Sequence, residues 1–152
     1  MGKVVEQKSS SGAKKLTNMA HFLVKQDPAN YPFSQFQKEK KTEWTGVRNY
    51  QARNFLRDMK KGDEVLFYHS GDEKAVVGFA SVSKAAFKDP TAEDDAWIAV
   101  ELKAGKNLKN PVTLPQIKAE PKLKDILLVR NGRISVMSLS KIEFNQIVKM
   151  GS

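Results

Sequence analysis

Short apolar runs between frequent turn signals constrain the fold of this chain more than any other sequence feature. Five runs are predicted to be strands, because they are apolar or alternating and are bounded by turn residues: 21–25, 64–69, 75–85, 97–102 and 133–139. Helices are predicted at 49–59, 114–119 and 141–150, and a shorter one opens at Ser34. No regular strand–helix–strand repeat is visible. The pattern therefore predicts an α+β fold, with a small, mostly antiparallel, barrel-like sheet and short helices packed around it.

Three helix starts carry a capping box, in which Ser or Thr is followed three residues later by Gln or Glu. These pairs are Ser34 with Gln37, Thr113 with Gln116, and Ser140 with Glu143. Gly78 inside a strand predicts a bulge or bend. The apolar segment 123–128 is ambiguous, and Trp97, on an alternating strand, is predicted to lie in the core.

The composition fits one globular domain, since 152 residues with 40% hydrophobic content can bury a core. Residues 1–18 are rich in Lys, Ser and Gly, so we expect a disordered basic leader or a tag, with the domain at 19–152. No run of 18 apolar residues predicts a membrane span, and no apolar block predicts a secretory signal. We expect a monomer, cytoplasmic and near the nucleoid in a bacterium, or nuclear in a eukaryote.

The charge of the chain favours polyanionic partners. The formal net charge is +9, of which four lysines and one glutamate place +3 in residues 1–18. The remaining +6 belongs to the folded part, so the basicity is not only a property of the leader. A basic domain of this size is typical of nucleic-acid binding.

Signals for catalysis are weak. The two histidines, His21 and His69, are not at metal-ligand spacing with another His, and cysteine is absent. The sequence has no P-loop, dinucleotide fingerprint or nucleophile elbow. Neither a metal nor another cofactor is predicted. An enzyme acting on nucleotides, with His69 and a carboxylate as acid and base, stays an alternative.

The segment 44–54 is the strongest binding signal in the chain. It combines two large aromatics, two arginines, two asparagines and a glutamine. Gly46 interrupts any continuous helix or strand, so a loop is expected to run into the helix 49–59. Aromatic rings can stack on a base, amides can bond its edge, and arginines beside a helix start can hold a phosphate. The alternative for Trp44 is that it packs beneath this loop.

These residues resemble the EVE domain family of the PUA-like group, over about 20–150. The resemblance rests on Lys25 and Pro28, the block 44–54, Gly62-Asp63 before Phe67-Tyr68-His69-Ser70, Val77-Gly78, the stretch 89–94, Trp97, Leu128-Val129-Arg130 and the stretch 133–137. Gln26-Asp27 stands where the family more often has Ser-Glu, and Ser138 where a proline is common. The resemblance implies a PUA-like β-barrel with an aromatic pocket for a modified base.

Carried over position by position, the resemblance implies a base pocket, and the basic residues on and just after the predicted helix 49–59 add a surface for the DNA backbone. The implied pocket consists of Lys25, Trp44, Val47, Arg48, Asn49, Tyr68, His69, Ser70 and Ser135. Phosphate contacts are assigned to Arg53, Arg57 and Lys60. The leading hypothesis is a non-catalytic reader of modified cytosine, 5-methylcytosine or 5-hydroxymethylcytosine, flipped out of DNA. Alternatives are a modified RNA, an enzyme, and a protein-interaction domain with a vestigial pocket.

Overall fold

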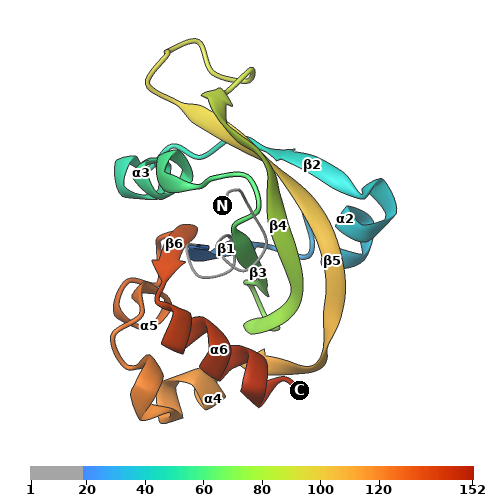
Figure 1. The fold of residues 1–152 in the computed structure, drawn as a ribbon, viewed down its shortest axis with the longest axis vertical. Helices are drawn as coiled ribbons and strands as arrows, with labels where there is room; N and C mark the ends of the chain where they lie inside the picture. The colour runs from blue at the N-terminus through green and yellow to red at the C-terminus, as the bar shows by residue number, and fades with distance from the viewer. Residues whose placement is uncertain (1–18) are drawn as a thin grey trace, which may run out of the picture.

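A computed structural model describes residues 19–152 as a mixed α+β fold built on one six-stranded sheet (Figure 1). The expected leader or tag at 1–18 lies outside the described residues. The elements, in chain order, are β1 (His21–Gln26), α2 (Phe33–Glu39), β2 (Lys41–Trp44), α3 (Tyr50–Asp58), β3 (Glu64–His69), β4 (Ala75–Lys88), β5 (Ile98–Thr113), α4 (Leu114–Ala119), a 3₁₀ turn (Pro121–Leu123), α5 (Leu127–Arg130), β6 (Val136–Leu139) and α6 (Lys141–Met150). The predicted α+β class is therefore confirmed.

The strands follow the order β2-β5-β4-β3-β1-β6 across the sheet. Hairpins join β3 to β4 and β4 to β5, and β1 pairs antiparallel with β6. Only β1 and β3 run parallel, with Lys25 opposite Tyr68 and Gln26 opposite His69. The parallel pair brings the carboxyl ends of both strands, and the loops that follow them, to one edge of the sheet.

The sheet curls without closing, so the expected barrel is not confirmed. Its edges are β2 and β6, which do not pair with each other. Helix α3 packs against both β6 and β5, and so covers the opening between the two edges (Figure 1). A helix in this position leaves no room for the two edge strands to meet.

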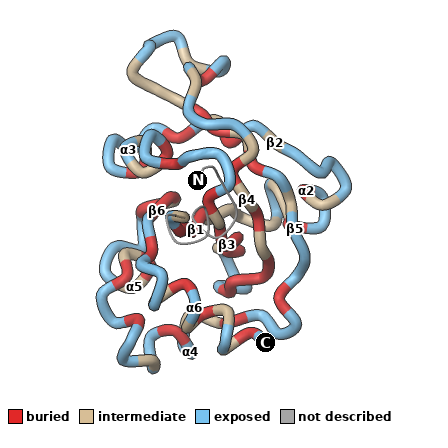
Figure 2. The backbone as a smooth tube through the Cα atoms, in the orientation of Figure 1, coloured by how far each residue is buried: buried red, intermediate tan, exposed pale blue. Residues whose placement is uncertain are grey.

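The central strands of the sheet are mostly buried (Figure 2), and β3 is buried at every position from Val65 to His69, so the core covers both of its faces. Phe67 of β3 packs against Phe33 and Phe36 of α2, with ring centroids 5.1 Å and 5.6 Å away. A Cβ at Gly78 would lie 2.3 Å from the Phe33 ring, so only glycine fits there. The β4–β5 register shifts on both sides of Gly78, which confirms the predicted irregularity.

Two of the three predicted capping boxes are confirmed, at Thr113 with Gln116 and at Ser140 with Glu143. The box at Ser34 is wrong, because α2 begins one residue earlier, at Phe33. The N–H of Phe33 donates to Nε2 of His69 at 3.0 Å. A side chain from β3 thus satisfies a free donor of the first turn, which a local capping residue would otherwise do.

Several strand boundaries differ from the prediction. No strand was predicted at 41–44, but this segment forms β2, paired with β5 at the sheet edge. Strand β5 continues beyond 102 to Thr113, because its second half pairs with the first residues of β4. Strand β6 starts at Val136 rather than at 133. Among residues 19–152, no helix is long and apolar enough to span a membrane.

Candidate nucleic-acid interface

The loop between β2 and α3 has a fixed shape. Gly46 adopts φ = 81°, a left-handed conformation that favours glycine, and its N–H donates to Oδ2 of Asp89 at 2.8 Å. Three residues later, Asn49 caps α3, because its side-chain oxygen accepts from the N–H of Ala52 at 2.9 Å. The loop and the helix start are therefore held in one arrangement.

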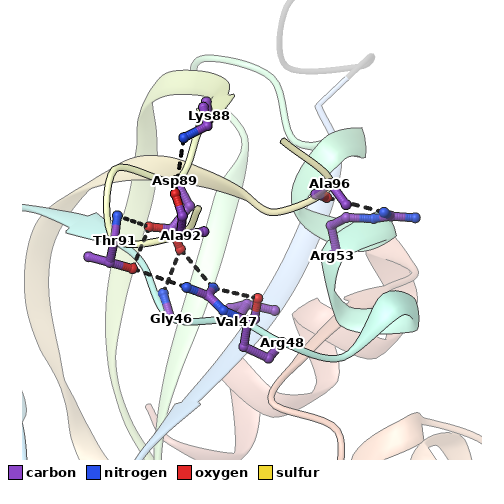
Figure 3. A network of polar contacts seen from close by, with 9 residues as sticks. All are labelled: Gly46, Val47, Arg48, Arg53, Lys88, Asp89, Thr91, Ala92 and Ala96. Carbon is purple, nitrogen blue, oxygen red and sulfur yellow. Dashed lines mark hydrogen bonds and ion pairs between the residues drawn. The ribbon is translucent and has the colours of Figure 1, made fainter. Parts of the chain in front are cut away.

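Asp89 joins this loop to the turn before β5 (Figure 3). Its side chain is fully buried, and Oδ2 accepts from the Arg48 guanidinium at 3.0 Å as well as from Gly46. Oδ1 accepts from the N–H and the hydroxyl of Thr91, at 2.7 Å and 2.6 Å. Four donors thus surround one buried carboxylate, and they come from segments more than 40 residues apart in sequence.

The four donors determine the charge state of Asp89. Burial alone would raise the pKa of the carboxyl, but the hydrogen bonds from Thr91, Gly46 and Arg48 outweigh burial and hold the pKa well below its usual range. Asp89 is therefore ionised at neutral pH, and its charge fixes the position of the Arg48 guanidinium. Arg48, whose side chain is 40% exposed, reaches solvent from a fixed position.

A cluster of rings and arginines lies beside the hydrogen bonds around Asp89. The rings of Tyr50 and Trp97 stack with centroids 4.8 Å apart at an interplanar angle of 31°. The Arg53 guanidinium lies 4.9 Å from the Tyr50 ring centroid and donates to the carbonyl of Ala96 at 3.1 Å. Arg48 lies 5.7 Å from the Trp97 ring centroid. Trp97 is only partly buried, so the prediction that it lies in the core is wrong.

A second group of predicted site residues meets at the carboxyl ends of β1 and β3. The N–H of Lys25 donates to the carbonyl of Ser135 at 2.9 Å, and its ammonium donates to the carbonyl of Gly132 at 2.6 Å. The same ammonium lies 5.9 Å from the Tyr68 ring centroid. Burial lowers the pKa of Lys25 and raises that of Tyr68. Ser70 follows β3, and its N–H donates to the carbonyl of Gln26.

Trp44 and His69 lie on the opposite face of the sheet from Lys25 and Tyr68. Residues alternate along a strand, so Phe67 and His69 share one face of β3 and Tyr68 faces the other way. The Phe67 and His69 rings are indeed in edge contact, with centroids 5.6 Å apart. Trp44 packs edge-on against Phe67 at 5.7 Å. The nine residues of the implied pocket therefore do not form a single cluster.

Trp44 itself separates the core from a cavity. Its side chain is 6% exposed, and it lines a cavity of about 300 Å³ together with Gln26, Asn30, Tyr31, Thr42, Glu43 and Thr45. Burial and a hydrogen bond to Glu39 raise the pKa of Tyr31 to about 12, so its hydroxyl keeps its proton at neutral pH. Most of this lining is polar, and the indole of Trp44 is its largest ring.

Both ring nitrogens of His69 are engaged in structural hydrogen bonds. Nε2 accepts from the N–H of Phe33, so the proton of the neutral ring is on Nδ1, which donates to Glu73 at 2.7 Å. The imidazole supports α2 and is 8% exposed. This arrangement matches a structural role rather than that of a general base.

The other predicted residues take varied positions. Val47 is buried in the core, while Arg57 and Lys60 are exposed at the end of α3 and just after it. Sequence reasoning missed Asp89 and the surface position of Trp97, and it included Tyr50 in the binding segment 44–54 without assigning it to the site. An aspartate before a proline is an ordinary turn signal, so only the cross-loop hydrogen bonds reveal its role. Among the described residues, no group of three or more acidic or histidine side chains could hold a metal ion.

A sequence profile described as the EVE domain matches residues 20–150. The chain belongs to the EVE domain family. Human thymocyte nuclear protein 1 is 30% identical in sequence, and the match covers 95% of this chain and 80% of that protein. The same protein from chicken is 29% identical, with coverage of 97% and 75%.

Solved structures of the EVE fold are also similar. A crystal structure of an Agrobacterium tumefaciens protein has a TM-score of 0.84 and 38% identity, covering 88% of this chain and 93% of that one. A crystal structure of human THYN1 in complex with DNA containing 5-methylcytosine has a TM-score of 0.81 and 27% identity, covering 88% and 98%. The similarity therefore extends over nearly all of the described EVE domain.

Proposed function

We propose that this EVE domain binds DNA and recognises a modified cytosine, without catalysing a reaction. The observation that carries the proposal is the similarity, over 88% of this chain, to human THYN1 in complex with DNA containing 5-methylcytosine. The charge of +9 and the exposed cations of α3 agree with a polyanionic partner. We expect the domain to act wherever the cell keeps its DNA, the nucleoid or the nucleus.

We propose that the flipped base binds in the cavity beside Trp44. Its volume of about 300 Å³ is at the lower end of the range for small-molecule sites. Gln26 and Asn30 carry both donors and acceptors, as the polar edge of a cytosine requires. The exposed edge of Trp44 would contact the ring. Flipping costs a few kcal/mol, and stacking on an aromatic returns about 1–3 kcal/mol.

The cluster at the ends of β1 and β3 is the second candidate pocket for the flipped base. The Lys25 ammonium lies near the Tyr68 ring, and the backbones of Ser70 and Ser135 are hydrogen-bonded to Gln26 and Lys25 at the same strand ends. Asn49, which the resemblance places in the same pocket, retains its amide NH₂ as a donor, because its oxygen already caps α3. The variants Trp44→Phe and Ser135→Ala distinguish the two candidate pockets, since each substitution alters a residue of one pocket only.

We assign phosphate binding to Arg53 and Arg57 of α3 and to Lys60, which follows the helix. Arg53, Arg57 and Lys60 follow one another at spacings of four and three residues, and no acidic residue lies in the first turn of the helix. Helix N-termini favour anions, and exposed arginines add sequence-independent attraction to DNA. Affinity should therefore fall steeply as the salt concentration rises.

The absence of turnover is supported by His69, the strongest candidate for a general base in the sequence. Its two nitrogens are bonded to Phe33 and Glu73, which leaves neither for a substrate. A modified nucleoside that is converted to a product, with conversion abolished in a His69→Ala variant, would contradict the proposal.

Fluorescence anisotropy with matched duplexes tests the function directly. The duplexes carry cytosine, 5-methylcytosine or 5-hydroxymethylcytosine at one position, at a fixed salt concentration. Burying one methyl group contributes about 0.8 kcal/mol, so a preference of a few-fold for a modified duplex is expected. Equal affinity for all three duplexes would overturn modified-base recognition. Tighter binding of the same sequence as RNA would favour the RNA alternative.

A further inference from the structure

Tyr50 is the one aromatic side chain among residues 19–152 that is both large and mostly exposed. Its exposed fraction is 61%, and the other large exposed hydrophobic of this part of the chain is Ile142, on α6. Tyr50 is the first residue of α3, directly after the cap residue Asn49. An exposed ring at the tip of a helix makes a small contribution to the core, so its position calls for another explanation.

The Tyr50 ring is nevertheless held in place. One side stacks on Trp97 at 4.8 Å, and the Arg53 guanidinium lies 4.9 Å from the ring centroid. Arg53 is itself anchored to the carbonyl of Ala96. A ring that is already ordered loses little conformational freedom when it binds, which favours a binding role.

Arginines lie close to Tyr50, and one of them, Arg48, is ion-paired with the buried Asp89. Arg48 and Arg53 flank the Tyr50–Trp97 pair, and Arg57 follows one turn later on α3. The loop 45–50 connects the cavity to the helix, because Thr45 lines the Trp44 cavity and Tyr50 is the first residue of α3. Five residues span at most about 18 Å, which corresponds to about five base-pair steps, so both ends can contact the same stretch of duplex.

We propose that Tyr50 inserts into the base stack of DNA at the space that the flipped nucleotide leaves. The inference rests on the proposed function, because only a reader that flips a base creates such a space. Proteins that distort a duplex commonly insert apolar or aromatic side chains between base steps. Here the Tyr50 ring would stabilise the flipped state by filling the space in the duplex, while the flipped base occupies its binding pocket on the protein. Trp97 and the arginines would brace the inserted ring and contact the adjacent phosphates.

The variant Tyr50→Ala tests the proposal against two forms of one oligonucleotide, duplex and single-stranded, each with a single 5-methylcytosine. Stacking of a base on an aromatic ring corresponds to about tenfold in affinity. We therefore expect Tyr50→Ala to bind the duplex about tenfold more weakly than the parent chain, and the single strand less than twofold more weakly. Tyr50→Phe should match the parent, because the ring and not the hydroxyl fills the space. Ile142→Ala is the control for an exposed hydrophobic outside the interface and should change neither affinity.

The outcomes separate the two proposals. Suppose that the parent prefers the methylated duplex, but Tyr50→Ala weakens binding to the duplex and to the single strand equally, or changes neither affinity. The insertion is then overturned and the proposed function stands. If the parent shows no preference for a modified base, the proposed function fails. Equal thermal unfolding of Tyr50→Ala and the parent verifies that a loss of affinity arises at the interface.

Discussion

The two tryptophans of the chain occupy opposite kinds of environment. Trp44 is 6% exposed and packs edge-on against Phe67, so it belongs mainly to the core. Trp97 is partly exposed and lies between Tyr50 and the guanidinium groups of Arg48 and Arg53. The sequence pointed the other way, because Trp44 has polar neighbours and Trp97 lies on an alternating segment.

The difference teaches that flanking residues are a poor guide to the environment of a large ring. Trp44 ends β2, an edge strand whose other residues are polar because they face solvent. Trp97 precedes the first residue of β5, where the chain leaves a turn held by Asp89. Burial depends on which elements cover a ring, and those elements lie far away in sequence.

The largest effect is expected from Trp44→Ala. Removing a buried tryptophan costs about 3–5 kcal/mol in the free energy of unfolding, since a cavity beside Phe67 remains. Urea denaturation measures this value, and Trp44→Phe, which keeps a ring, should lose clearly less. A loss below about 1 kcal/mol would remove Trp44 from the core and erase the contrast with Trp97.

Asp89→Asn should cost about 2 kcal/mol in the free energy of unfolding, because hydrogen bonds to a charged group are worth about 1.5–3 kcal/mol. The substitution removes the charge that holds Arg48 beside Trp97. Asp95→Asn is a matched control, since the Asp95 side chain is 92% exposed. Equal stability of the two variants would show that the hydrogen bonds to the Asp89 carboxylate do not stabilise the region around Trp97.

The pH dependence of stability tests whether the ionised Asp89 carboxylate stabilises the fold. The pKa of Asp89 is lower in the folded chain than in the unfolded chain, where it is about 4. Its contribution is therefore complete above pH 4 and is lost as the pH falls through the folded-state pKa. Urea midpoints measured from pH 7 down to pH 3 should drop more steeply for the parent chain than for Asp89→Asn. Parallel curves would contradict the low pKa.

Trp97→Ala should cost only about 1 kcal/mol in stability, because the residue is only partly buried. Its effect on DNA affinity should be larger, about tenfold, since the support for Tyr50 and Arg53 is lost. Anisotropy with the methylated duplex and urea denaturation of the same preparation give both numbers. A stability loss equal to that of Trp44→Ala would mean that both rings serve the core.

The smallest effect is spectroscopic. Trp44→Phe leaves only Trp97 as a tryptophan, and Trp97→Phe leaves only Trp44. Acrylamide should quench the emission of the chain that retains Trp97 more strongly than that of the chain that retains Trp44. Bound DNA should protect Trp97 from the quencher. Equal quenching of the two variants would break the comparison.

Local signals in the sequence predicted much of the fold. The capping boxes at Thr113 and Ser140 were predicted from adjacent residues and are confirmed, because their hydrogen bonds join residues three positions apart. The range of β3 is also confirmed, because its apolar run and the turn residues on both sides are local signals, although its partner strands are β1 and β4. The start of α2 was not predictable, since its partner His69 belongs to β3. The second half of β5 lacks alternation and is held by pairing with β4.

The candidate site was predicted only in its parts. The sequence identified the loop at Gly46 and the helix start at Asn49, because turn and cap residues have local signatures. It could not reveal that Arg48 is bound to Asp89, 41 residues later, or that Trp44 and Tyr68 face opposite ways. Both facts follow from the pairing and curvature of the sheet.

The position of β1 in the sheet has a consequence for biosynthesis. This strand leaves the ribosome before every other described strand, yet one of its two neighbours, β6, follows more than 100 residues later, with His21 opposite Leu139. Until β6 emerges, β1 presents an unpaired edge that can bind another nascent chain. Folding should therefore finish late, and chaperone demand should be greatest just before the last strand is made.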